Sequence, residues 1–140
     1  RMMAIIAEGE LGRIYLSPTN AMEDVARQAK PGWKPDVEFF QQALGFRVGN
    51  YGMTKWADLF TPRQLLALTT FSDLVQEVRE RVQCDALAAG LPNSGTSLST
   101  GGNGAIPYAD AVSVYLAFAV DKYSIYGNSL VPWYPQESRT

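Results

Sequence analysis

The sequence lacks the residues on which most acid-base and metal chemistry depends. Its 140 residues contain no histidine and a single cysteine, Cys84. Histidine is the commonest general base near neutral pH and the commonest metal ligand. A lone cysteine excludes an internal disulfide framework and a multi-cysteine zinc site within this chain. Cys84 falls in the middle of an expected helix with no histidine to activate it, so we interpret it as structural.

Neither an excess of charge nor a long hydrophobic run is present. The 12 basic and 14 acidic residues give a net charge of -2, which excludes a generally basic nucleic-acid-coating protein but leaves room for a local basic patch. The richest apolar run, residues 111–120, is shorter than the roughly 18 residues of a membrane span. The apolar start meets Glu8 too soon for a signal peptide. We therefore expect a soluble cytoplasmic protein in which residues 111–120 form a buried helix.

The first half of the chain predicts a hairpin, a short helix and an irregular segment. Two apolar runs flank Gly9-Glu10-Leu11-Gly12, which is typical of a β-hairpin over residues 2–17. Asn20 followed by Glu23 is a capping-box pattern and predicts a helix over residues 20–29. Residues 30–60 have no sustained period, and we expect their aromatic side chains to anchor an irregular segment to the core. These aromatics are Trp33, Phe39, Phe40, Phe46, Tyr51 and Trp56.

The second half predicts two long helices. Thr61 and Gln64 form a capping-box pattern that opens a helix over residues 62–89, with apolar residues spaced by three and four. This helix, about 42 Å long, would outgrow a small globule, so we expect one end to project or to pack on other sequence. Residues 92–107 are rich in glycine and serine and predict a flexible loop, and a second helix follows over residues 107–126. The fold class is therefore α+β, with a small antiparallel hairpin packed with two long helices and one short one.

Two patterns that suggest catalysis have simpler interpretations. The Gly101-Gly102-Asn103-Gly104 stretch does not follow an expected strand, and no lysine follows it before Lys122, so a phosphate loop is not indicated. Neighbouring carboxylates such as Glu77 and Glu80 lie on expected helix faces rather than in a cleft. We assign no catalytic residue from these patterns.

One stretch combines basic, amide and aromatic side chains next to an expected helix N-terminus. Basic groups and the free N–H groups of that terminus could hold phosphate, and aromatic faces could stack an unpaired base. The simpler alternative is that the aromatic residues of this stretch are core anchors. The candidate nucleic-acid-binding residues are Arg47, Asn50, Tyr51, Lys55, Trp56, Arg63 and Gln64.

The same stretch carries a resemblance to a known family. Residues 51–71, which begin Tyr51-Gly52-Met53-Thr54-Lys55-Trp56, resemble a segment of the adenine-specific DNA methylases that contain a zinc ribbon and an associated domain of unknown function. Residues 13–19 and 108–119 are similar to the same family and occur in the same order. Ala57 departs from the pattern, because a glycine is expected at that position.

The resemblance implies a parent enzyme that transfers a methyl group from S-adenosylmethionine to the exocyclic amine of adenine in DNA. In that family the glycine-rich cofactor loop and the zinc ribbon precede this region, and an Asp-Pro-Pro-Tyr motif follows it. None of these motifs is present here. The resemblance therefore implies a non-catalytic internal segment, with S-adenosylmethionine and zinc bound elsewhere in the parent. The implied partners are DNA, contacted through the parent protein, and the remainder of the methyltransferase.

Two other functions remain open. A scaffold or protein-interaction domain could use the long amphipathic helix, either with a partner or to form a homo-oligomer. An independent small-molecule enzyme is the weakest interpretation, because histidine, a cysteine pair and converging carboxylates are all missing. By the methylase interpretation, this segment helps the parent enzyme to position DNA or shapes its catalytic domain, and the isolated chain transfers no methyl group.

Overall fold

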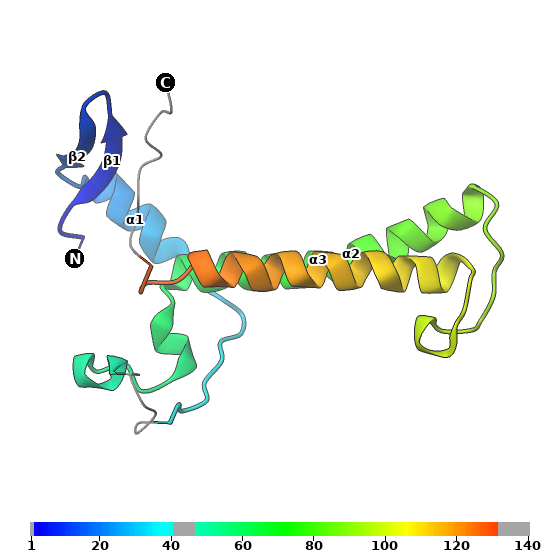
Figure 1. The fold of residues 1–140 in the computed structure, drawn as a ribbon. Coiled ribbons are helices and arrows are strands. Elements are labelled where there is room, and N and C mark those ends of the chain that lie inside the picture. The colour runs from blue at the N-terminus through cyan, green and yellow to red at the C-terminus, as the bar shows by residue number, and fades with distance from the viewer. Residues whose placement is uncertain (1, 41–46, 132–140) are drawn as a thin grey trace. The chain divides into compact units, whose positions relative to one another are not determined.

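The computed structural model describes residues 2–40 and 47–131, which form two compact units. One unit contains the described residues up to Leu66 and those from Ser129 on, and the other is Ala67–Asn128. The fold class is α+β, as predicted, with one two-stranded antiparallel sheet, two long helices and one short helix in the described residues (Figure 1). In chain order the elements are β1 (Ile5–Gly9), β2 (Gly12–Leu16), α1 (Asn20–Gln28), α2 (Pro62–Ala88) and α3 (Ala105–Tyr126).

The hairpin closes through a two-residue loop. Ile5 pairs with Leu16, and the register continues to Gly9 opposite Gly12. Gly12 has a φ of 119°, a conformation that side-chain-bearing residues rarely adopt, so glycine is required where the chain re-enters the sheet. The hairpin therefore lies where the sequence predicted it, inside residues 2–17.

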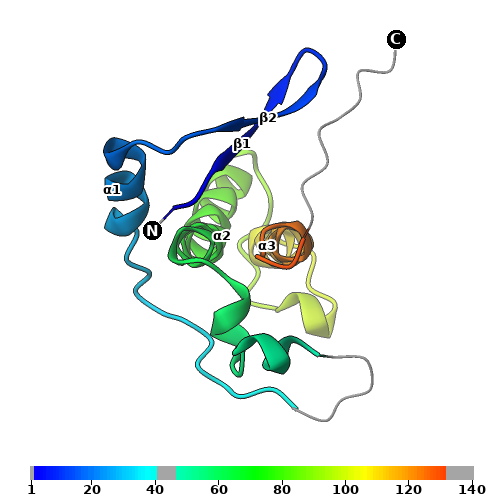
Figure 2. The same cartoon turned by 90° about the vertical axis from the view of Figure 1, so that its left-hand side faces the viewer.

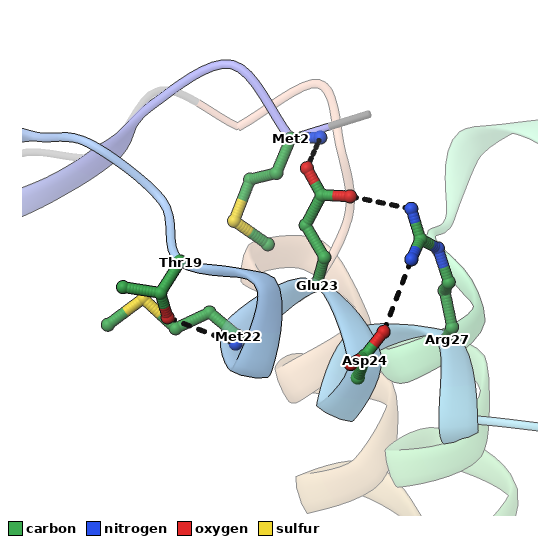
Figure 3. Close-up of polar contacts among 6 residues, drawn as sticks. All are labelled: Met2, Thr19, Met22, Glu23, Asp24 and Arg27. Carbon is green, nitrogen blue, oxygen red and sulfur yellow. Dashed lines mark hydrogen bonds and ion pairs between the residues drawn. The ribbon is translucent and has the colours of Figure 1, made fainter.

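The cap of α1 differs from the predicted one. Thr19, not Asn20, is the N-cap, and its hydroxyl accepts a hydrogen bond from the backbone N–H of Met22 at 3.4 Å (Figure 3). Glu23 does not complete a capping box from Asn20. Its carboxylate accepts the backbone N–H of Met2 at 3.0 Å and pairs with Arg27 at 2.6 Å. Glu23 thus ties the chain before β1 to the first turns of α1.

The irregular segment contains a short antiparallel pairing. The backbone N–H of Phe39 donates to the carbonyl of Thr54 at 3.2 Å, and that of Trp56 donates to the carbonyl of Val37 at 3.0 Å. Two 3-10 turns, Val48–Tyr51 and Trp56–Leu59, complete the described part. Residues 41–46, which include Phe46, lie outside the described residues.

The aromatic residues of this segment do not all anchor it. Phe39 is buried, and its ring packs edge to face on Trp56 with centroids 5.3 Å apart. Trp33, Phe40 and Tyr51 are exposed, by 65% to 85% of their surface. The expected anchoring is therefore right for Phe39 and wrong for these three.

The predicted N-terminus of α2 is confirmed. The backbone N–H of Gln64 donates to the Thr61 hydroxyl at 3.3 Å, and the side-chain oxygen of Gln64 accepts the backbone N–H of Thr61 at 2.8 Å. At the other end, the N–H of Leu91 donates to the carbonyl of Ala86, and Gly90 has a φ of 93°. This closing motif supplies hydrogen-bond donors to carbonyl groups of the last turn of the helix. The helix therefore ends one residue before the predicted boundary.

The second unit is a helical hairpin. Helices α2 and α3 lie side by side in both views (Figures 1 and 2). Phe71 contacts Tyr123 near one end, and Arg79 pairs with Asp110 at 2.6 Å farther along, so the helices run antiparallel. The fully buried Ala105 belongs to the start of α3, which begins two residues before the predicted position.

The loop before α3 folds against its own backbone. A 3-10 turn, Leu98–Thr100, interrupts it, and the carbonyl of Ser97 accepts the backbone N–H of Gly102 at 3.0 Å. A Cβ added at Gly102 or Gly104 would overlap a loop carbonyl. The glycines of this loop therefore permit close backbone packing next to the buried start of α3.

Candidate functional site

The seven candidate residues lie on three short stretches of the first unit. Arg47 precedes the turn that holds Asn50 and Tyr51, and all three are exposed, Tyr51 by 84%. Lys55 and Trp56 open the next turn, and Arg63 and Gln64 occupy the first turn of α2. A phosphate or a base can therefore reach the first group directly, and Arg63 is likewise exposed.

Lys55 is held by acidic neighbours. Its ammonium group lies 2.8 Å from the carboxylate of Asp36, and its backbone N–H donates to the carboxylate of Asp58 at 2.9 Å. The hydrogen bond from Lys55 lowers the pKa of Asp36, and the same bond raises the pKa of Lys55. Backbone N–H groups of Lys55 and Thr54 lower the pKa of Asp58. A phosphate could bind the Lys55 ammonium only by displacing the Asp36 carboxylate. This lysine therefore links two segments of the protein.

Two more of the seven have structural partners. The ring of Trp56 packs against Phe39, although 45% of the residue remains exposed. Gln64 completes the cap of α2 with Thr61. Within the part of the chain that the structure describes, the exposed side chains of Arg47, Asn50, Tyr51 and Arg63 have no such structural partner.

The helical hairpin of α2 and α3 contains a groove, and none of the seven candidate residues lines it. Its volume is about 350 Å³, and among the described residues that line it Tyr123 alone has a polar side-chain group. The apolar periodicity of α2 was the sequence signal for one wall, but the opposite wall depends on how α3 packs. The groove is lined by Phe71, Leu74, Val75, Val78, Leu116, Ala119, Val120 and Tyr123.

The central stretch of α3 is exposed rather than buried. Val114, Tyr115 and Phe118 show 46%, 76% and 62% of their surface. A helix that is apolar nearly all round is typical of a buried position, and α2 covers only one side of it. The expectation of a central helix is therefore wrong for this chain by itself. No helix in the described residues is long and apolar enough to cross a membrane.

A second cavity, of about 660 Å³, lies in the first unit. Met2, Met3, Ser17, Pro18, Asn20 and Glu23 line it. The carboxylate of Glu23 already accepts the N–H of Met2 and pairs with Arg27. These partners give Glu23 a structural role at the edge of this cavity.

The chain does not fit the zinc and methyl-donor groups that the resemblance implies for the parent. Within residues 2–40 and 47–131, no group of three or more histidine, cysteine, aspartate or glutamate side chains could hold a metal ion. Cys84 is exposed on α2. The glycine-rich loop follows a helix and packs on its own carbonyls, unlike a cofactor loop that follows a strand.

Comparison with known proteins leaves the family undetermined. No protein-family model matches the sequence, and no significant match exists among the curated proteins or the solved structures compared with it. The methylase resemblance of residues 13–19, 51–71 and 108–119 thus stays a prediction.

Proposed function

We propose that this chain is a non-catalytic, cytoplasmic segment of an S-adenosylmethionine-dependent adenine-specific DNA methyltransferase, and that its helical hairpin supports the catalytic part of the same polypeptide. The observation that carries this proposal is the open apolar groove between α2 and α3, whose lining side chains are suited to burial. The occupant follows from the resemblance, in which catalytic motifs stand on both sides of this region.

The energetics favour coverage of the hairpin. Around the groove, Tyr123 on α3 and Phe71, Leu74 and Val78 on α2 each expose between 37% and 45% of their surface. Complete burial of one such side chain is worth about 1.5–3 kcal/mol. Covering even the exposed parts of several of them therefore contributes several kcal/mol, which is comparable to the whole stability of a small domain.

Ion pairs among the described carboxylates support a non-catalytic role. Acid-base catalysis needs carboxylates that converge in a cleft with shifted protonation. Here Asp36 pairs with Lys55, Asp110 with Arg79, and Glu23 with Arg27. Each of these carboxylates stabilises the local fold instead of facing a substrate.

The first test is the coding sequence on both sides of these residues. A glycine-rich cofactor motif upstream and an Asp-Pro-Pro-Tyr motif downstream would support the proposal, and flanks without them would contradict it. The intact parent should then methylate adenine in DNA, whereas the 140-residue chain should show no turnover. Methyl transfer by the chain alone would overturn the non-catalytic assignment.

The support role has its own test in the parent. Leu74→Glu places a charge in the groove, whereas Gln76→Glu places the same charge on an exposed position of α2 outside the groove lining. We expect Leu74→Glu to lower the parent's methylation rate and thermal midpoint, and Gln76→Glu to leave both near the native values. Equal behaviour of the two variants would show that no other part of the enzyme covers the groove.

A second candidate role, DNA positioning, has a specific observation in its favour. Arg47, Tyr51 and Arg63 are exposed in the same unit, and Arg63 stands in the first turn of α2, where the helix dipole favours phosphate. This role supplements the support role, since it uses the other unit of the chain. The net charge of -2 makes tight DNA binding by the isolated chain unexpected.

A further inference from the structure

The exposed side of α3 carries a heptad pattern. Six residues recur at alternating spacings of three and four, which is the pattern of the apolar seam in a coiled coil. Four of them expose 53% to 76% of their surface, and Lys122 is also exposed. The seam consists of Tyr108, Ala111, Tyr115, Phe118, Lys122 and Ile125.

This seam is distinct from the groove that faces α2. The α3 residues of the groove are Leu116, Ala119, Val120 and Tyr123, and none belongs to the seam. With 3.6 residues per turn, the centres of the two sets are about 120° apart around the helix. A molecule on the seam can therefore pack without entering the groove.

We propose that the seam is the docking site for a second copy of this chain, with the two α3 helices antiparallel about a two-fold axis near Tyr115 and Phe118. An isologous interface needs a surface whose positions complement one another when the direction of the helix is reversed. The seam meets this requirement, because each of its six positions then faces another seam position. The opposed pairs are Tyr108 with Ile125, Ala111 with Lys122, and Tyr115 with Phe118.

Lys122 specifies the antiparallel direction. In a parallel pair, Lys122 would face Lys122 of the other copy, and Ala111 would face Ala111 and leave a gap. In the antiparallel pair, the long stem of Lys122 crosses the small Ala111, and its ammonium extends past the edge of the seam toward solvent. The ammonium already lies 5.6 Å from the centre of the Tyr126 ring, along the edge of the seam. Antiparallel packing thus avoids repulsion between the two Lys122 ammonium groups and fills the space above Ala111.

The exposed area matches the requirement of a stable dimer. The four aromatic residues Tyr108, Tyr115, Phe118 and Tyr126 are 53% to 76% exposed. At about 200 Å² for each fully buried aromatic, they offer about 500 Å² per copy, or about 1,000 Å² for two. Val114 and Ile125 add to this, which brings the interface to about 1,200 Å² or more, the lower bound for stable protein interfaces.

The oligomeric state of the chain tests this proposal. Sedimentation equilibrium should give twice the 15.4 kDa mass of the chain. Phe118→Glu should raise the dissociation constant of the dimer about thirtyfold or more, as truncation of a central anchor does. Ala117→Glu, on an exposed position of α3 outside the seam, should leave the dimer intact. Circular dichroism on both variants confirms that each keeps its helices, and a monomeric native chain would overturn the proposal.

Cysteine cross-linking tests the direction independently of any loss of folding. In a Cys84→Ser background, one preparation carries Ala111→Cys and the other carries Lys122→Cys. The antiparallel pair predicts that the mixture forms a disulfide between the two variants faster than either variant forms one with itself. Preferential self-linking of either variant would indicate a parallel pair, and cross-linking no faster than that of an exposed control cysteine at Ala117→Cys would indicate no seam contact. Both results would overturn the proposal.

Discussion

The ammonium group of Lys55 lies 2.8 Å from the carboxylate of Asp36, nineteen positions earlier in the chain. This ion pair spans the short antiparallel pairing in which Trp56 donates to Val37 and Ala57 donates to Pro35. It therefore holds two stretches of the irregular segment in register. Lys55, a candidate phosphate contact, is therefore engaged in an ion pair within the protein, and this affects both stability and DNA binding.

The first prediction concerns the pH range over which the ion pair of Lys55 and Asp36 stabilises the folded chain. Asp36 has a lowered pKa in the folded chain, so its contribution to stability is present above the ordinary aspartate pKa and is lost as the pH falls through the folded value. Lys55 has a raised pKa, so its contribution is present below the ordinary lysine pKa and is lost as the pH rises through the folded value.

Urea unfolding across pH measures this effect. Asp36→Asn should reduce the loss of stability between neutral pH and acid, because the variant no longer has that carboxylate to protonate. Both side chains are substantially exposed, so the difference should shrink in high salt. Asp24→Asn, on an exposed i,i+3 pair of α1, is the control. Identical pH profiles for native chain and Asp36→Asn would contradict the role given to Asp36.

The second prediction separates Arg63 from Lys55 in DNA binding by the parent. Arg63→Ala should weaken binding for all DNA sequences and reduce the slope of log affinity against log salt by about one, as loss of one phosphate contact does. Lys55→Ala should have a smaller effect on the slope, because its charge is already balanced by Asp36. Fluorescence anisotropy at several salt concentrations measures both slopes. A larger slope change for Lys55→Ala would place Lys55, and not Arg63, against the phosphate.

Features set by neighbouring residues could be predicted from the sequence. Thr61 and Gln64 are three positions apart, and their reciprocal hydrogen bonds need only the local helix geometry. The stop at Gly90 depends on one residue's access to positive φ. The short hairpin loop before Gly12 depends in the same way on its glycine. Each of these signals is local and can therefore be recognised in the sequence without knowledge of the rest of the fold.

Features set by distant partners could not be predicted. Glu23 follows Asn20 at capping-box spacing, but its carboxylate binds Met2, twenty-one positions away. The spacing of Lys55 from Asp36 gives no sequence signal either. The burial of Tyr115 was expected because its neighbours are apolar, yet burial depends on a covering surface, which α2 supplies on one side only. Among the candidate residues, Lys55 thus has a partner that its position in the sequence did not indicate, and the exposed face of α3 is the feature that the structure adds.

The third prediction concerns the cap of α2. Thr61→Ala removes the hydroxyl that accepts the backbone N–H of Gln64, and it should lower the free energy of unfolding by about 1 kcal/mol. Thr61→Ser keeps the hydroxyl and should lose much less. Chemical denaturation of the two variants and the native chain gives the comparison. Equal losses for Ala and Ser would assign the effect to the lost methyl group and not to the cap.

The last prediction concerns the glycines before α3. A Cβ at Gly104 would overlap the carbonyl oxygen of Pro92, which accepts the backbone N–H of Ala105 at 2.9 Å. Ala105 is fully buried, so the loop cannot withdraw without exposing the start of the helix. Gly104→Ala should therefore lower the free energy of unfolding by about 1–3 kcal/mol, the usual cost of overpacking.

Gly95 provides the matched control in the same loop. A Cβ there meets no atom within 4 Å, so Gly95→Ala should change stability by no more than about 0.5 kcal/mol. Urea denaturation followed by circular dichroism measures both variants, and hydrogen exchange at Ala105 reports on the loop directly. Faster exchange at Ala105 in Gly104→Ala alone is the expected result. Equal stability of the two variants would mean that the loop accommodates the methyl group, and that its glycines do not act through close packing against Pro92.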